Sequence, residues 1–187
     1  CGTCALVGNS KTLWGSGLSH NINQCTAAFG MNQGHAQGFE TAANQTTGHF
    51  VYPGNASNWG SWRQLVLLVL KLSGLVWTSD ALSEEVMVGP LSLLPCLREI
   101  SPTFLRCNQG NWLDDRGQYA FLGLMALFCA LHICDQVSLF GFGTDQLMRW
   151  SHYWDDDYWF ESNMHSFTEE QKAVLNLQRE GKVVTHS

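Results

Sequence analysis

Four short apolar runs stand out along the chain, and residues that favour turns bound each of them. Gly, Pro, Asn and Ser interrupt the apolar pattern beside these runs, as they do where strands give way to loops. A continuous apolar run of four to eight residues is typical of a strand that is buried on both faces. We therefore predict buried strands over residues 4–7, 49–52, 65–70 and 137–140.

Two longer segments predict helices. Residues 123–134 form an apolar run of good helix formers, and residues 168–179 place Val174, Leu175 and Leu177 at helical spacing, with Thr168 as the N-cap. Strands that alternate with helices imply a mostly parallel sheet with helices on both faces. Because no repeat, low-complexity segment or linker divides the sequence, we predict a single-domain, Rossmann-like α/β fold over residues 1–187.

Composition limits the class of function. The chain has 187 residues, of which 45% are hydrophobic, so it can bury a sizeable core. Its formal net charge is -6, and only 10 residues are Lys or Arg. Binding to nucleic acid needs a clustered basic face, which no window of this sequence supplies. An anionic ligand must therefore be held by local donors.

Cysteines and glycosylation sequons indicate an oxidising, secretory compartment. The chain has 7 Cys, and N-x-Ser/Thr sequons begin at Asn44 and Asn55. The alternative is that the sequons occur by chance and that the cysteines are small buried hydrophobes. We favour the secretory interpretation. The best apolar run, residues 65–77, is too short for a bilayer and contains Lys71, so we expect neither a membrane span nor a signal peptide in this sequence.

A polar, glycine-rich loop follows the first predicted strand. It reads Gly8-Asn9-Ser10 and continues to Gly15-Ser16-Gly17. Open α/β folds bind ligands at the carboxyl ends of their strands, and the Asn9 amide can both donate to and accept from a nucleotide. Asparagine after a strand is also a common turn former, so the pattern alone leaves the role of Asn9 open.

Further motifs follow this loop in a fixed order. The first motif covers residues 4–53 and includes Met31-Asn32-Gln33 and the segment His49-Phe50-Val51-Tyr52-Pro53. The second covers residues 119–143, the third is His152-Tyr153-Trp154-Asp155, and the last is His165 with Glu170 five positions later. In type and order they resemble the four sialylmotifs of the animal sialyltransferases. Residues 71–83 look most like the branch that sialylates position 3 of galactose on Galβ1,3GalNAc.

The resemblance implies both a fold and an activity. The fold would be a GT-A-like variant, and the activity would be transfer of sialic acid from CMP-sialic acid to the 3-hydroxyl of terminal galactose on O-glycans or glycolipids. Such transfer is inverting and needs no metal or other cofactor. The resemblance also implies a Golgi-lumen enzyme that is a single-pass type II membrane protein when full-length. Residues 1–187 would then be its catalytic domain, without the upstream tail, membrane anchor and stem.

Two histidines are the candidate catalytic residues. Sialyl transfer needs a base for the acceptor hydroxyl and a partner for the departing phosphate, and histidine can serve as either near neutral pH. By resemblance His165 is the base and His152 contacts the phosphate. Either histidine taken alone would more often be structural, and its place in a motif favours the catalytic role. The resemblance assigns the donor, CMP-sialic acid, to Asn9, Ser10, Asn32, Tyr119, Gly123 and His152.

The same resemblance pairs Cys4 with Cys134 and pairs Cys1 with a cysteine upstream of this sequence. The remaining four cysteines allow three connectivities, which the sequence leaves open: Cys25, Cys96, Cys107 and Cys129. We interpret His132, which lies among Leu and Ile on a predicted helix, as structural. Four other histidines receive no role: His20, His35, His49 and His186.

The acidic triplet Asp155-Asp156-Asp157 suggests a different mechanism, because acidic D-x-D patterns hold the metal of many nucleotide-sugar transferases. The triplet follows the third motif, and the family that the chain resembles works without a metal. We therefore interpret the triplet as a solvated acidic loop and rank a metal-dependent transferase last. The sequence contains no serine-hydrolase elbow, no phosphate-binding P-loop and no zinc spacing.

The sequence departs from the family pattern in several places. The family's Pro-Ser-Thr-Gly, whose hydroxyls help hold the donor carboxylate, reads Ala120-Phe121-Leu122-Gly123 here. Ile100 stands where the family has a tyrosine that helps hold the donor phosphate, and Gly30 replaces an arginine. Each lost hydrogen bond to a charged group weakens binding by roughly 1.5–3 kcal/mol. Our first hypothesis is an active sialyltransferase; the alternative is an impaired domain that binds a glycan or a protein partner without turnover.

Overall fold

One parallel sheet organises the chain. The computed structural model describes residues 2–13, 15–31, 46–52, 64–68, 76, 97–113, 122–142 and 167–186. Within these ranges seven strands pair in the order β5-β4-β3-β2-β1-β6-β7, and every pairing is parallel. The strands are β1 (Thr3–Val7), β2 (Ala27–Met31), β3 (Gly48–Val51), β4 (Gln64–Leu68), β5 (Leu97–Ile100), β6 (Gln136–Phe140) and β7 (Val183–His186). The sheet predicted from the sequence is confirmed.

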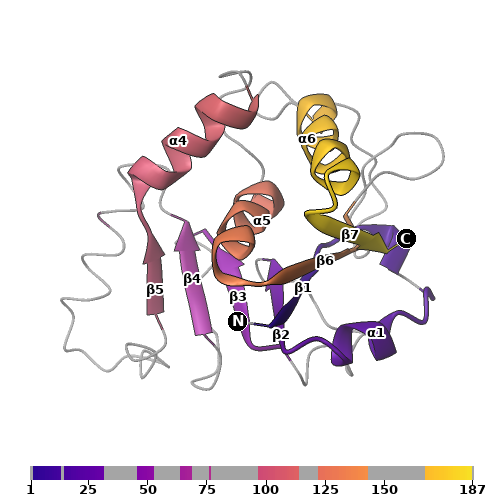
Figure 1. Cartoon of the computed structure of the whole chain (residues 1–187). Helices are drawn as coiled ribbons and strands as arrows, with labels where there is room; N and C mark the ends of the chain where they lie inside the picture. Colours follow the sequence, from indigo (N-terminus) through magenta and orange to yellow (C-terminus); the bar gives the residue numbers. More distant parts are fainter. Residues whose placement is uncertain are drawn as a thin grey trace, which may run out of the picture.

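Helices cover both faces of this sheet. Three of them, α4 (Pro102–Leu113), α5 (Leu122–Ile133) and α6 (Phe167–Arg179), lie over one face, and α1 (Ser19–Asn23) lies over the other (Figure 1). A short 3-10 helix, η1 (Lys11–Leu13), joins β1 to α1. None of the helices in the described ranges is long and apolar enough to cross a bilayer.

Alternation along β1 builds two cores from one strand. Cys4 and Leu6 pack into the cluster that contains α5, while Ala5 packs with Leu13 and Ile22 on the opposite face. Successive side chains of a strand point to opposite faces, and here both faces are covered by helices. This is why the strands appear in the sequence as continuous apolar runs rather than as alternating patterns.

The central helix, α5, is buried on all sides in its first nine residues, Leu122 to Ala130. Its C-terminal end is tied to β1. Cys134 forms a disulfide with Cys4, 130 positions away, which is the pair that the family resemblance implies. The Gly2 amide donates to the Asp135 carboxylate over 2.7 Å, beside the disulfide. In the chain-entropy model, a cross-link over a loop of this length stabilises the fold by about 5 kcal/mol.

The end of α6 shows why this helix stops and turns back into the sheet. Gly181 has φ of 69°, in the left-handed region that favours glycine. The Gly181 amide donates to the Gln178 carbonyl over 3.0 Å, and the Lys182 amide donates to the Leu177 carbonyl over 2.9 Å. These two bonds are those of a Schellman motif. The chain therefore enters β7 within three residues of the helix end.

Several sequence-based predictions can be compared with these elements. The four predicted strands are present as β1, β3, β4 and β6, although residues 69 and 70 lie outside the described residues. The two predicted helices are present as α5 and α6. The predicted N-cap Thr168 is wrong, because α6 begins at Phe167 and Thr168 lies inside its first turn. Strands β2, β5 and β7 and helix α4 were not predicted.

Candidate active site

The sheet has a topological switch point between β1 and β6. These strands are neighbours, but β1 leads to α1 on one face of the sheet, whereas α6, the next described element after β6, packs on the other face. Open α/β sheets bind ligands in the crevice outside the carboxyl ends of the strands at such a point. Asn9 and Ser10 follow β1 there, and Gly141 and Phe142 follow β6. The polar loop after β1 therefore lies at the expected ligand edge.

Two backbone hydrogen bonds fix the loop after β1 against the loop after β6. The Gly8 amide donates to the Phe140 carbonyl over 2.7 Å, and the Ser10 amide donates to the Gly141 carbonyl over 3.2 Å. A β-carbon on Gly8 would overlap the Gly141 carbonyl oxygen and would lie 3.0 Å from its carbon. Glycine is thus required at position 8 so that the two loops can approach closely.

The side chain of Ser10 shapes this loop from within. Ser10 is buried, and its hydroxyl oxygen accepts from the Thr12 amide over 3.3 Å and from the Thr12 hydroxyl over 3.1 Å. These two hydrogen bonds stabilise the start of η1. Asn9, which precedes Ser10, is half-buried at the edge of the sheet. The rigid Ser10 corner therefore presents Asn9 at the switch point.

The N-terminus of α5 reaches the same edge of the sheet. Only two residues, Cys134 and Asp135, separate α5 from β6, so the helix ends at the amino end of that strand. Its 12 residues span about 18 Å, close to the length of a five-residue strand, so its first turn lies near the carboxyl edge. Gly123 is the second residue of this helix. The first amides of a helix lack intrahelical partners and favour an anion.

Leu122 explains one departure from the family pattern. Its side chain is only 3% exposed and belongs to the core cluster around α5. The position where the family has threonine therefore contributes packing in this chain. The backbone amides of the first turn do not depend on that substitution, so they can still bind a carboxylate or phosphate. Ile100, at the end of β5, also packs against this cluster.

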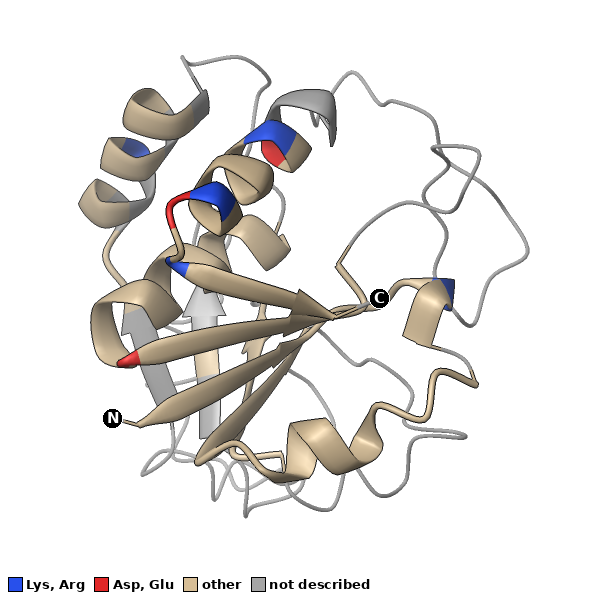
Figure 2. Cartoon of the chain, turned by 45° about the vertical axis from the view of Figure 1, so that its right-hand side comes forward, with Lys and Arg blue, Asp and Glu red and all other residues tan. Residues whose placement is uncertain are grey.

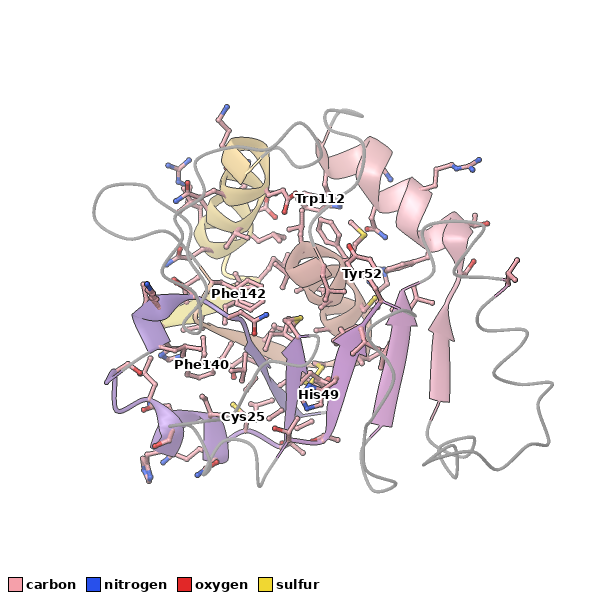
Figure 3. The ribbon with its side chains drawn as sticks, turned by 180° about the vertical axis from the view of Figure 1, so that it is seen from behind. Cys25, His49, Tyr52, Trp112, Phe140 and Phe142 are labelled. Atoms are coloured by element: carbon pink, nitrogen blue, oxygen red, sulfur yellow. A yellow bond between two sulfur atoms is a disulfide. The ribbon has the colours of Figure 1, made fainter. Side chains whose placement is uncertain are left out.

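A tyrosine and a buried carboxylate add to this region. Tyr52 directly follows β3 and packs against the core cluster that includes α5 (Figure 3). Glu170, in the first turn of α6, is 6% exposed. Burial, and then the negative charge of Glu170, raises the pKa of Tyr52 to about 12. Tyr52 therefore stays protonated near neutral pH. No local pattern indicates this pair, because 118 positions separate its members.

The predicted site residues fall into two groups. The structure brings Asn9, Ser10 and Gly123 to one edge of the sheet, as argued above. Six others lie outside the described residues: Asn32, Asn44, Asn55, Tyr119, His152 and His165. The acidic triplet at residues 155–157 also lies outside them. In the ranges that are described, no three His, Cys, Asp or Glu side chains gather as a metal site.

Two histidines without a catalytic assignment make structural contacts. His132 Nδ1 lies 2.7 Å from the Phe128 carbonyl oxygen, and its ring meets the Phe104 ring edge-on at 5.1 Å. This agrees with its interpretation as a structural residue. The His186 ring stacks on the Phe140 ring with centroids 4.4 Å apart, which holds the end of β7 against β6. Among the described cysteines outside the disulfide, Cys25, Cys107 and Cys129 are free thiols.

The parallel sheet, its two helical layers and its polar switch-point loop define a doubly wound α/β protein with a candidate ligand edge beside β1 and β6. Residues 1–182 match the family model described as glycosyltransferase family 29 (sialyltransferase). The chain belongs to this family, and the resemblance seen in its motifs is confirmed.

Relatives with curated names identify the branch that the chain is similar to. CMP-N-acetylneuraminate-beta-galactosamide-alpha-2,3-sialyltransferase 2 of Mus musculus is 36% identical over 166 residues, which are 84% of this chain and 47% of the relative. Human CMP-N-acetylneuraminate-beta-galactosamide-alpha-2,3-sialyltransferase 1 is 30% identical over 166 residues, which are 84% of this chain and 49% of the relative. The chain thus spans about half the length of the curated relatives it matches.

Solved structures agree with the fold. A crystal structure of a mammalian sialyltransferase matches 100% of this chain and 69% of its own chain, with a TM-score of 0.83 and 27% identity. A second crystal structure, of a mammalian sialyltransferase in complex with Gal-beta-1-3GalNAc-ortho-nitrophenol, matches the same shares of both chains with a TM-score of 0.81. The predicted α/β fold class is therefore confirmed.

Proposed function

We propose that residues 1–187 act as the catalytic domain of an inverting α2,3-sialyltransferase. The substrates are CMP-sialic acid and a glycan that ends in galactose, as on O-glycans or glycolipids, and the product linkage is at the galactose 3-hydroxyl. The observation that carries the proposal is the position of Asn9 and Gly123 at one switch-point edge, in a chain whose family transfers sialic acid. The disulfide and the two sequons support the Golgi lumen as the compartment.

The proposed reaction is a single displacement at the anomeric carbon. His165 accepts the proton of the galactose 3-hydroxyl, and the hydroxyl oxygen forms the new bond to the anomeric carbon. The bond from that carbon to the CMP phosphate oxygen breaks, and its electron pair leaves with CMP. His152 donates a hydrogen bond to the departing phosphate. No metal or other cofactor is part of this proposal.

The order of elements supports a role for His165. Phe167, the first residue of α6, comes two positions after His165 in the sequence. Three residues connect α6 to the amino end of β7, so α6 begins toward the carboxyl edge of the sheet. Glu170, the second member of the family's last motif, faces the core in the first turn of this helix. The motif thus spans the entry to a helix that starts at the ligand edge.

One observation favours the second candidate function, an impaired domain that binds a glycan or protein partner without turnover. Leu122 contributes to the core where the family supplies a hydroxyl, so the donor carboxylate loses that contact. A loss of roughly 1.5–3 kcal/mol per contact lowers the affinity for the donor about tenfold to a hundredfold. Binding and turnover must therefore be measured separately.

The test combines CMP binding by calorimetry with sialyl transfer to Galβ1,3GalNAc in EDTA, on protein from a secretory host. We expect the wild-type protein to bind CMP and to transfer sialic acid. His165→Ala should abolish transfer and leave CMP affinity nearly unchanged, because the base does not contact the nucleotide. Transfer that requires manganese would reject the metal-free mechanism. CMP binding without transfer would support the impaired domain, and absence of both in folded protein would overturn the proposal.

A further inference from the structure

One lysine lies directly beside the candidate ligand edge. Lys11 follows Ser10 and begins η1, at the end of the sheet where β1 and β6 finish (Figure 2). The other Lys and Arg residues in the described ranges lie elsewhere, on β5, α4, α6 and the turn before β7: Arg98, Arg106, Lys172, Arg179 and Lys182. Within the described structure, Lys11 is therefore the one basic side chain that follows a strand at the switch point.

The backbone on both sides of Lys11 is fixed. Ser10 donates its amide to the Gly141 carbonyl, and the Leu13 amide donates back to the Ser10 carbonyl over 3.1 Å. Leu13 is 2% exposed, and a β-carbon on Gly141 would overlap its side chain, so η1 packs tightly on the loop after β6. Lys11 itself is half-buried. The backbone thus holds Lys11 at a fixed position beside the loop after β6.

The positive charge of Lys11 suits this position to binding an anionic ligand. CMP-sialic acid carries one phosphodiester and one carboxylate, and the chain has a net charge of -6, so its overall field does not attract such a ligand. A lysine ammonium is a compact point charge that binds phosphate and carboxylate groups without a fixed geometry. At the edge where two family hydroxyls are missing, a nearby cation can replace part of the lost binding.

We propose that Lys11 binds an anionic group of the sugar nucleotide, its phosphate or its carboxylate, at the edge between β1 and β6. The inference rests on the proposed function, because it takes CMP-sialic acid as the ligand. It adds a binding residue that the motif comparison does not assign.

Three ligands and three variants test the role of Lys11. Calorimetry would compare cytidine, CMP and CMP-sialic acid, without acceptor, on the wild-type protein, Lys11→Met, Lys11→Arg and the control Lys182→Met. Lys182 is exposed at the amino end of β7, on the opposite edge of the sheet. We expect Lys11→Met to lower the affinity for an anionic ligand about tenfold to a hundredfold and to leave the affinity for cytidine unchanged. It should also reduce the salt dependence of binding. Lys11→Arg should retain most of the affinity, and Lys182→Met all of it.

Each outcome has a distinct meaning. If Lys11→Met binds CMP more weakly, Lys11 contacts the phosphate. If it binds CMP as before but CMP-sialic acid more weakly, Lys11 contacts the carboxylate. Both results support the proposal. An equal loss of affinity for cytidine would show that the substitution disturbs the structure, and no loss of affinity for any ligand would show that Lys11 makes no contact. Either result overturns the proposal for Lys11. CMP binding by the wild-type protein would still support the proposed function. If the wild-type protein binds no CMP at all, the proposed function fails and this inference fails with it.

Discussion

The ring of His49 occupies the space in front of Gly30. The two residues are register partners in β3 and β2, and a β-carbon on Gly30 would lie 2.7 Å from His49 Cε1 and 2.8 Å from Nδ1. His49 is 5% exposed, so its ring has little room to move aside. The glycine at this position, where the family has arginine, is therefore matched to its neighbour on the next strand.

This match predicts a coupled pair of mutations. Gly30→Ala should lower the free energy of unfolding by about 1–3 kcal/mol, because the new methyl group meets the ring. In a His49→Ala background the same change should have a much smaller effect, which urea unfolding of the four proteins would measure. Equal effects in both backgrounds would show that the ring is not the obstacle.

A second prediction concerns the contact between Gly8 and Gly141. Gly8→Ala places a methyl group against a backbone carbonyl, so we expect a loss of about 1–3 kcal/mol in unfolding free energy and weaker CMP binding. Gly181→Ala is the matched control, since it strains a left-handed glycine far from the site and should cost about 1–2 kcal/mol without changing CMP affinity. Unchanged CMP affinity in folded Gly8→Ala would contradict a role for this corner in binding.

The third prediction follows from the pKa of Tyr52. Its ordinary value is 10.0 and its value in the folded protein is about 12, so the folded state holds the phenol proton more tightly. The associated stability is complete below pH 10 and is lost as the pH rises toward 12, by roughly 2–3 kcal/mol in all. In Tyr52→Phe, the unfolding free energy should therefore fall less over this pH range.

Glu170→Gln isolates the electrostatic part of that shift. Removing the negative charge should lower the pKa of Tyr52, while burial keeps it above 10.0. Ultraviolet titration of tyrosinate would measure this, with Tyr52→Phe identifying the transition that belongs to Tyr52. Cys129, whose pKa burial raises to about 12, is the same in all three proteins and cancels in the comparison. An unchanged Tyr52 transition would exclude Glu170 as a cause.

The fourth prediction concerns the altered start of α5. Restoring the family residues with Phe121→Ser and Leu122→Thr should raise CMP-sialic acid affinity about a hundredfold, because two hydroxyls return and each contributes about tenfold or more. The same Leu122→Thr change should lower stability by about 2–3 kcal/mol, since it removes a core side chain. Leu122→Met, which keeps the volume, should cost less than about 1.5 kcal/mol and leave affinity unchanged. No gain in affinity with folded protein would reject the damaged-pocket interpretation.

Local pattern was enough to predict the elements with strong signals. The apolar runs at β1, β3, β4 and β6 predicted strands buried on both faces, and α5 was predicted from its unbroken run of helix formers. The weaker elements were missed for physical reasons. Strand β5 contains Arg98 and Glu99, β2 consists mainly of Ala and Gly, and β7 is four residues long with Val184 exposed. Their stability comes from neighbouring strands rather than from their own composition.

Short-range patterns in the sequence were enough to predict the fold class, the order of the motifs and the polar loop at Asn9 that follows β1. Each of these depends on residue types at short spacing, which can be read directly from the amino-acid sequence. The tertiary structure alone decided that Gly30 faces His49, that Glu170 acts on Tyr52 and that Lys11 stands beside the β1–β6 switch point. These relationships depend on strand order and register, and register is set by contacts between residues far apart in the chain.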